Sequence, residues 1–281
     1  MLPSIITVEK LMEIIELPKE VQHELTQVIS QLEENQLITS GKRLLEVTKA
    51  EDEAKRLSEV YQGETIKELA FHLYAASMSW ERVYLPRQIP FEIYQETMHA
   101  FTRFLEESKR INHFYQFDRG FWTWRFVCGL EFRINQLEFE MVTPPHKNKV
   151  PELAEKGYIS IHIPSDADMT YSIIAKNYAE AKKFITKYFP DYRSASFITD
   201  TWLLSPKLKD WLKPDANLNL FANDYQILLS EPNKNEGVFW IFNTISSDVT
   251  SYPEKTSLQR AAKKEMLQGG HIGSAVGILI H

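Results

Sequence analysis

The sequence predicts a mixed fold, α+β or α/β, in which a helical N-terminal part precedes a sheet with packed helices. Through the first ~115 residues, apolar side chains recur every three or four positions, which is the period of an α-helix. After Asp118 the pattern changes to short runs that alternate apolar and polar residues, interleaved with helical periods. A chain of 281 residues can bury two modest cores. We therefore expect a helical domain over 1–117 and a second domain over 118–281.

The N-terminal part reads as five amphipathic helices joined by short links. The fourth is the most apolar, with Leu69, Leu73 and Ala76 on one stripe, and the prolines at 86 and 90 follow it. Such helices pack as a bundle or a layer. The predicted helical segments are 7–17, 21–32, 44–60, 66–78 and 93–111.

The second part begins with strand signals. Leu137, Phe139 and Met141 alternate with two glutamates, and Asn135-Gln136 is a candidate hairpin turn before them. A further strand is predicted over 158–164, and a long helix after it ends before Pro190. We expect Ser165 and Asp168 to cap that helix. Later strands are predicted at 195–201, 217–220, 225–229, 238–243 and 272–280, with helices at 206–212 and 256–268.

Composition excludes several classes of protein. The net charge of −6 gives no basic patch for nucleic acid, and no run reaches the ~18 to 20 apolar residues that span a bilayer. The N-terminus does not read as a signal peptide, and Cys128 is the single cysteine, in an apolar run typical of a buried thiol. We therefore expect a soluble cytoplasmic protein without disulfides, and the oligomeric state stays open.

Three polar residues on predicted strands are candidates for proton transfer. His162, Glu138 and Glu140 each lie on the polar face of a strand whose other face is apolar. An imidazole or a carboxylate there could take a proton from a nucleophile. The alternative is that a half-exposed strand simply presents these residues to solvent. The histidine spacings match no zinc motif, so we expect no metal site.

Five segments of the sequence carry a family resemblance: GFWTWR (120–125), EFRINQLEFE (131–140), ISIHIPSDA (159–167), WLLSP (202–206) and TSLQRA (256–261). Together they resemble a bacterial acyltransferase family that joins an N-acyltransferase N-terminal domain to a GNAT-like C-terminal domain. The resemblance covers essentially the whole chain and is strongest from Gly120 to Ile280. It implies a GNAT-like sheet and acyl transfer from acetyl-CoA or another acyl-CoA to an amine or similar small-molecule acceptor. His162 and the two glutamates would then lie near the acceptor cleft.

The chain departs from the usual GNAT pattern at the expected pyrophosphate loop. That loop is glycine-rich and opens the helix after the central strand, where backbone amides bind phosphate. Here the equivalent segment, 164–168, has no glycine and carries two aspartates. Gln259, Arg260 and Lys263 on the last predicted helix are the candidates for binding a CoA phosphate. The alternative function is a non-catalytic ligand- or partner-binding protein on the same scaffold.

Overall fold

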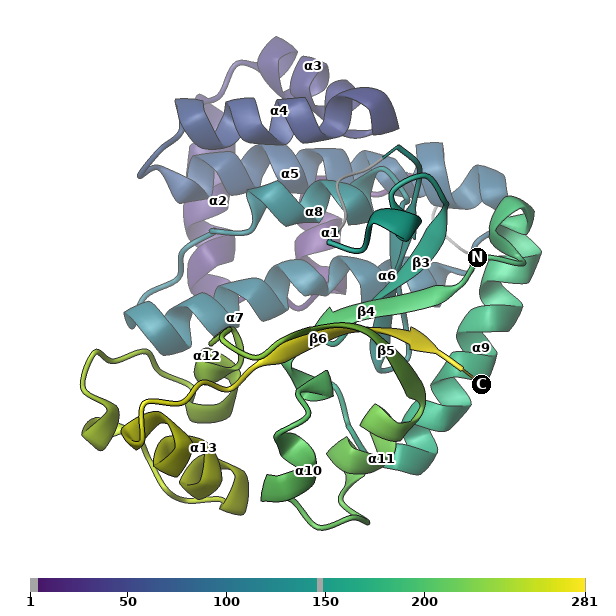
Figure 1. The fold of residues 1–281 in the computed structure, drawn as a ribbon. Helices are drawn as coiled ribbons and strands as arrows, with labels where there is room; N and C mark the ends of the chain where they lie inside the picture. Colours follow the sequence, from purple (N-terminus) through teal and green to yellow (C-terminus); the bar gives the residue numbers. More distant parts are fainter. Residues whose placement is uncertain (1–4, 146–148, 281) are drawn as a thin grey trace. The chain divides into compact units, whose positions relative to one another are not determined.

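The computed structural model describes residues 5–145 and 149–280 (Figure 1). The chain forms two compact units, residues 1–135 and 136–281, so that the segment from 118 to 135 belongs to the first unit. The domain boundary that we predict from the sequence, between residues 117 and 118, remains a prediction. Within the described residues, no helix is both long enough and apolar enough to cross a membrane.

The first unit is helical, as predicted. Helix α5 contacts α1, α2, α3 and α8, and most of its side chains are buried. The predicted helices at 44–60 and 93–111 are each divided, the first before Val47 and the second at His99. Its elements are α1 (Val8–Ile14), α2 (Lys19–Gln31), α3 (Glu34–Leu44), α4 (Val47–Val60), α5 (Thr65–Ser79), α6 (Phe91–Met98), α7 (Ala100–Asn112), α8 (Gly120–Val127) and β1 (Glu131–Ile134).

The second unit is built on a mixed sheet, which confirms the predicted fold class. Its strands lie in the order β2-β3-β4-β6-β5, and β3 and β4 are parallel whereas the other neighbours are antiparallel. Asn135 adopts a positive φ of 55° in the two-residue turn before β2, as the hairpin prediction requires. The strands are β2 (Leu137–Val142), β3 (Tyr158–His162), β4 (Phe197–Thr201), β5 (Tyr225–Glu231) and β6 (Ser274–Leu279).

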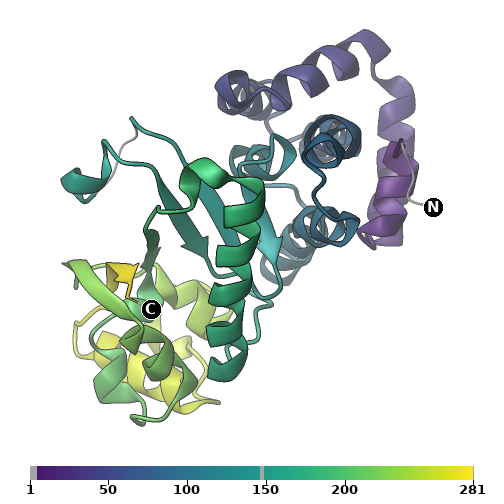
Figure 2. The ribbon, with the colours of Figure 1, turned by 90° about the vertical axis from the view of Figure 1, so that its right-hand side faces the viewer.

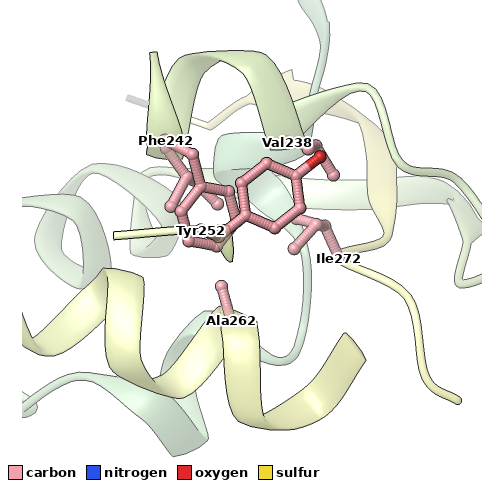
Figure 3. Close-up of a cluster of buried hydrophobic side chains, with 6 residues drawn as sticks. Val238, Phe242, Tyr252, Ala262 and Ile272 are labelled. Atoms are coloured by element: carbon pink, nitrogen blue, oxygen red, sulfur yellow. The ribbon is translucent and has the colours of Figure 1, made fainter. Parts of the chain in front are cut away.

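Helices of the second unit pack around this sheet. Helix α9 contacts β2 and α11 and runs beside the strands (Figure 2). Between β5 and β6 the chain inserts α12 and α13, which share a small apolar core in which the rings of Phe242 and Tyr252 stack with centroids 4.3 Å apart (Figure 3). The helices are α9 (Tyr171–Tyr188), α10 (Leu208–Trp211), α11 (Asn217–Asn223), α12 (Gly237–Phe242) and α13 (Ser257–Leu267).

Three predictions for the second unit are wrong. The segments 217–220 and 238–243 are helical and form parts of α11 and α12, because a short apolar run does not by itself distinguish a strand from a buried helix. Gly237 opens α12 so close to Trp202 that a Cβ there would lie 2.8 Å from the indole Cγ. Ser165 and Asp168 do not cap α9, which begins later at Tyr171.

Candidate functional site

The parallel strands β3 and β4 separate within the sheet. Their register in the described structure consists of two pairs, Ile159 with Phe197 and Ser160 with Ile198. Beyond them β3 continues beside β2 and β4 continues beside β6. The hydroxyl of Thr199 donates to the carbonyl of Ile161 over 2.9 Å, so a side chain occupies an acceptor that a backbone amide would otherwise take. Regular pairing between β3 and β4 thus stops before either strand ends, and we refer to the stretch beyond the last register pair as the split.

His162 lies at the carboxyl end of β3, beside this split. Its Nε2 is 2.9 Å from Oε2 of Glu140, and the two side chains are 24% and 15% exposed, so both are partly accessible. Glu138 is directly opposite His162 in the β2–β3 register and is buried. The period of two along a strand places Glu138, Glu140 and His162 on the same face of the sheet. The structure therefore brings the three predicted catalytic residues together.

Asp200 of β4 occupies the corresponding place on the other side of the split. It lies two residues beyond the last β3–β4 pair, as His162 does, so both side chains are on the face that carries Ser160 and Ile198. Lys149 binds Asp200 at 2.7 Å and Glu231 at 2.6 Å. Burial alone would lower the pKa of Lys149, but hydrogen bonds with these carboxylates raise it well above its usual value. Lys149 is consequently a cation that neutralises Asp200.

Backbone amides in the segment between β3 and α9 donate hydrogen bonds to side chains of the same unit. The amide of Tyr171, the first residue of α9, donates to Oδ1 of Asn217 at 3.2 Å. The amide of Asp168 donates to Oε1 of Gln136 at 2.8 Å. These contacts replace the expected Ser165–Asp168 cap. They also occupy amides that would meet a phosphate at the start of a helix.

The predicted phosphate-binding residues on α13 make contacts within their own unit. Gln259 completes a capping box with Thr256 and donates to the carbonyl of Ile241 at 3.0 Å. Lys263 is buried and donates to the carbonyl of Tyr252 at 2.8 Å. The guanidinium of exposed Arg260 donates to a backbone carbonyl at 2.9 Å. A phosphate-binding role for these three residues remains a prediction.

Sequence reasoning missed a buried polar pair in the helical unit. Glu68 and His72 lie one turn apart on α5, and both face the start of α8, where a Cβ on Gly120 would collide with the Glu68 carboxyl. Nδ1 of His72 is 3.0 Å from the hydroxyl of Thr123, and its Nε2 has no hydrogen-bond partner in the described structure. Burial, then the charge of Asp118, raises the pKa of Glu68 to about 7. The sequence did contain a signal for this pair, because a glutamate and a histidine four residues apart lie within an otherwise apolar helical segment.

The split sheet and its flanking polar residues define a GNAT-like architecture. The chain belongs to the family described as the GNAT-like C-terminal domain, whose model matches residues 131–279. The model of the N-acyltransferase N-terminal domain matches residues 6–129. Both confirm the resemblance that the sequence motifs indicate.

Solved structures with the same fold are acyltransferases. One was crystallised in complex with decanoyl-CoA and teicoplanin (TM-score 0.74, 18% identity), and a mutant with octanoyl-CoA (TM-score 0.75, 18% identity). A third is in complex with CoA and a teicoplanin derivative (TM-score 0.74, 18% identity). Each match covers 97% of this chain and 87% of the other. No curated protein sequence matches the chain significantly.

Proposed function

We propose that this protein is an acyl-CoA-dependent acyltransferase that acylates an amine or a similar small-molecule nucleophile. The observation that carries the proposal is the split between β3 and β4, with His162 and Glu140 in hydrogen-bond contact beside it. We expect an extended thioester arm to bind along the strand ends that lie beyond these register pairs. Membership of a GNAT-like family and the acyl-CoA complexes of similar structures support the same reading.

In the proposed reaction, the acceptor nitrogen forms a bond to the thioester carbonyl carbon and the carbon–sulfur bond breaks. The imidazole of His162 takes the proton that the nitrogen loses, and CoA leaves as a thiolate that takes up a proton. The carboxylate of Glu140, 2.9 Å from Nε2, orients the ring and stabilises the positive charge that the ring gains when it takes the proton. Glu140 therefore acts through His162, as a positioning residue.

The test compares His162→Gln with the unchanged protein in a panel of acetyl-, octanoyl- and decanoyl-CoA with primary amines. Release of the CoA thiol measures turnover, and thermal shift measures acyl-CoA binding. We expect His162→Gln to lower kcat about 100-fold or more while acyl-CoA binding is kept, because general-base catalysis contributes about 10² to 10⁴. His23→Gln, an exposed histidine of α2, is the matched control. Turnover that is unchanged in His162→Gln would exclude this base.

The alternative, a protein that binds a ligand without catalysis, is favoured by the absence of a glycine between β3 and α9. It predicts that acyl-CoA, or another ligand, raises the melting temperature without release of CoA in the presence of any amine. At 100 times its dissociation constant a ligand adds ~2.7 kcal/mol to stability, which thermal shift detects readily. No shift with acyl-CoA or free CoA at millimolar concentration would contradict the acyltransferase proposal.

A further inference from the structure

The start of α9 is poorly suited to holding the phosphates of a CoA thioester. Its first amide is bonded to Asn217, and the amide of Asp168 is bonded to Gln136. The carboxylate of Asp168 is exposed and accepts from the amide of Thr170 at 2.9 Å, which lowers its pKa and keeps it charged. A diphosphate placed there would meet a fixed negative charge and amides that already have partners. The phosphates of the ligand need another site.

A groove that begins at Tyr171 and extends along α9 to Lys182 has the size and lining of a ligand site. It has a volume of about 650 Å³, which is within the usual range for small-molecule pockets. One wall is a single face of α9 that includes Tyr171 and Tyr178, and the other includes Phe197 of β4 and Leu279 of β6. In Figure 1, β4 begins and β6 ends beside this helix. The aromatic walls give a nucleobase apolar surface against which to pack.

Cations line this groove and its continuation. Lys182 and Arg193 belong to the 650 Å³ groove, and Lys182 also lines an adjoining groove of about 460 Å³ with Lys183 and Lys187. Within the described residues, no carboxylate forms an ion pair with any of these four side chains. One carboxylate, that of Asp224, also lines the 650 Å³ groove; it is buried and accepts from the hydroxyl of Tyr171 at 2.8 Å. In a chain with a net charge of −6, four cations beside this one carboxylate favour an anionic ligand.

The groove also lies within reach of the split. Phe197 lines the groove and is the first residue of β4, and its partner Ile159 is the first register position of the parallel pair. From Phe197 to Thr199, where the split begins, β4 rises about 7 Å, and to Thr201 about 13 Å. The side chain of Phe197 is on the sheet face opposite to that of Ile198, Asp200 and His162. An extended pantetheine arm is long enough to cover this span, and it must pass between the ends of β3 and β4 to reach His162.

We infer that the groove between α9 and β4 binds the phosphorylated nucleotide end of acyl-CoA, with Lys182 and Arg193 as its phosphate-binding residues. This inference rests on the proposed acyltransferase function and adds to it the part of the chain that holds the donor. Lys183 and Lys187 extend the positive surface for the remaining phosphate. Side-chain cations thus take the place of the glycine-rich loop.

Calorimetric titration with CoA, dephospho-CoA and pantetheine tests the inference. We expect the unchanged protein to bind CoA more tightly than pantetheine, since pantetheine lacks the nucleotide and its phosphates. Lys182→Ala and Arg193→Ala should each weaken CoA binding by about tenfold or more, because each removes a charge-assisted contact. Pantetheine binding should not change in either variant. Lys209→Ala, an exposed lysine of α10, is the control and should bind CoA as the unchanged protein does.

The competing site on α13 is tested in the same experiment with Arg260→Ala. If CoA binds and the affinity falls in Arg260→Ala but not in the α9 variants, the inference is overturned while the acyltransferase proposal remains. The inference is likewise overturned, and the acyltransferase proposal remains, if neither the α9 variants nor Arg260→Ala alters CoA binding. If the unchanged protein binds no CoA at all, both the inference and the proposed function are wrong. Circular dichroism of each variant verifies that a loss of binding is not a loss of folding.

Discussion

Replacing Glu68 by glutamine should stabilise the protein at alkaline pH. Glu68 is only 5% exposed, and burial, followed by the charge of Asp118, raises its pKa from the ordinary value of 4.5 to about 7. Between these two values the folded chain binds a proton that the unfolded chain releases. The contribution of Glu68 to stability is therefore fully present below pH 4.5 and is lost as the pH rises through 7. Glutamine has the shape of the protonated acid and carries no charge at any pH.

The magnitude follows from the shift. Each pKa unit corresponds to 1.36 kcal/mol, so a rise from 4.5 to about 7 corresponds to about 3 kcal/mol. The stability of Glu68→Gln relative to the unchanged protein should thus increase by up to about 3 kcal/mol between pH 4.5 and pH 8. His72, whose pKa burial lowers to about 3, works in the opposite direction below pH 6.5. Because His72 is present in both proteins, its contribution cancels in the difference.

The assay is urea unfolding followed by far-UV circular dichroism at pH 4.5 and pH 8 for both proteins. Glu64→Gln, an exposed glutamate just before α5, is the control and should show no such pH-dependent difference. A difference for Glu68→Gln that does not change with pH would refute the reasoning, since the acid would then have the same pKa in both states. A variant that becomes relatively less stable at pH 8 would show that Glu68 is charged and stabilised in the fold.

Three further predictions concern other buried groups. Lys263→Ala removes the hydrogen bond to the Tyr252 carbonyl, and we expect thermal unfolding to show a loss of stability of about 1–3 kcal/mol. The control, Arg260→Ala, removes an exposed side chain and should change stability by about 0.5 kcal/mol or less. Equal effects of the two variants on stability would contradict a structural role for Lys263. Burial raises the pKa of the Cys128 thiol to about 12. A chromogenic disulfide reagent at pH 8 should therefore label Cys128 only after the protein unfolds. Labelling of the native protein at the rate of free cysteine would contradict the burial of this thiol. Burial alone would raise the pKa of Glu53, but hydrogen bonds from two arginines and a serine lower it to about 2. Glu53→Gln should therefore be destabilised at pH 7, and the difference should diminish as the pH falls from 4.5 towards 2; a constant difference would refute the assignment.

The architecture was accessible from the sequence because periodicity reports burial directly. The apolar stripe of α5 and the alternation along β2 each predicted both the type of element and its buried face. The last helix was predicted over 256–268, and the capping box at Thr256 and Gln259 marks its observed start. His162 and the two glutamates were predicted to share a cleft-side face, and the β2–β3 register places them on one face. Their catalytic role remains a prediction.

What the sequence could not supply depends on contacts between distant segments. α12 is helical where an apolar run favoured a strand, and it packs against Trp202 and Ile272, residues far from it in the chain. The start of α9 is determined by Asn217, some 46 residues away, and not by a nearby serine. The groove beside α9 forms only where the ends of β4 and β6 meet this helix, and no local sequence pattern encodes that meeting.

The insertion between β5 and β6 lies next to the carboxyl end of β4. It ends where β6 begins, and Ala275 near the start of β6 pairs with Thr201, the last residue of β4. Its helices bury their apolar residues mainly against one another and against Trp202 and Trp211, and the sheet ladder on either side continues without them. Natural variation could therefore lengthen, shorten or exchange this stretch while the strand pairing persists. The insertion thus adds a small core of its own beside the carboxyl end of β4 without interrupting the pairing of β5 with β6.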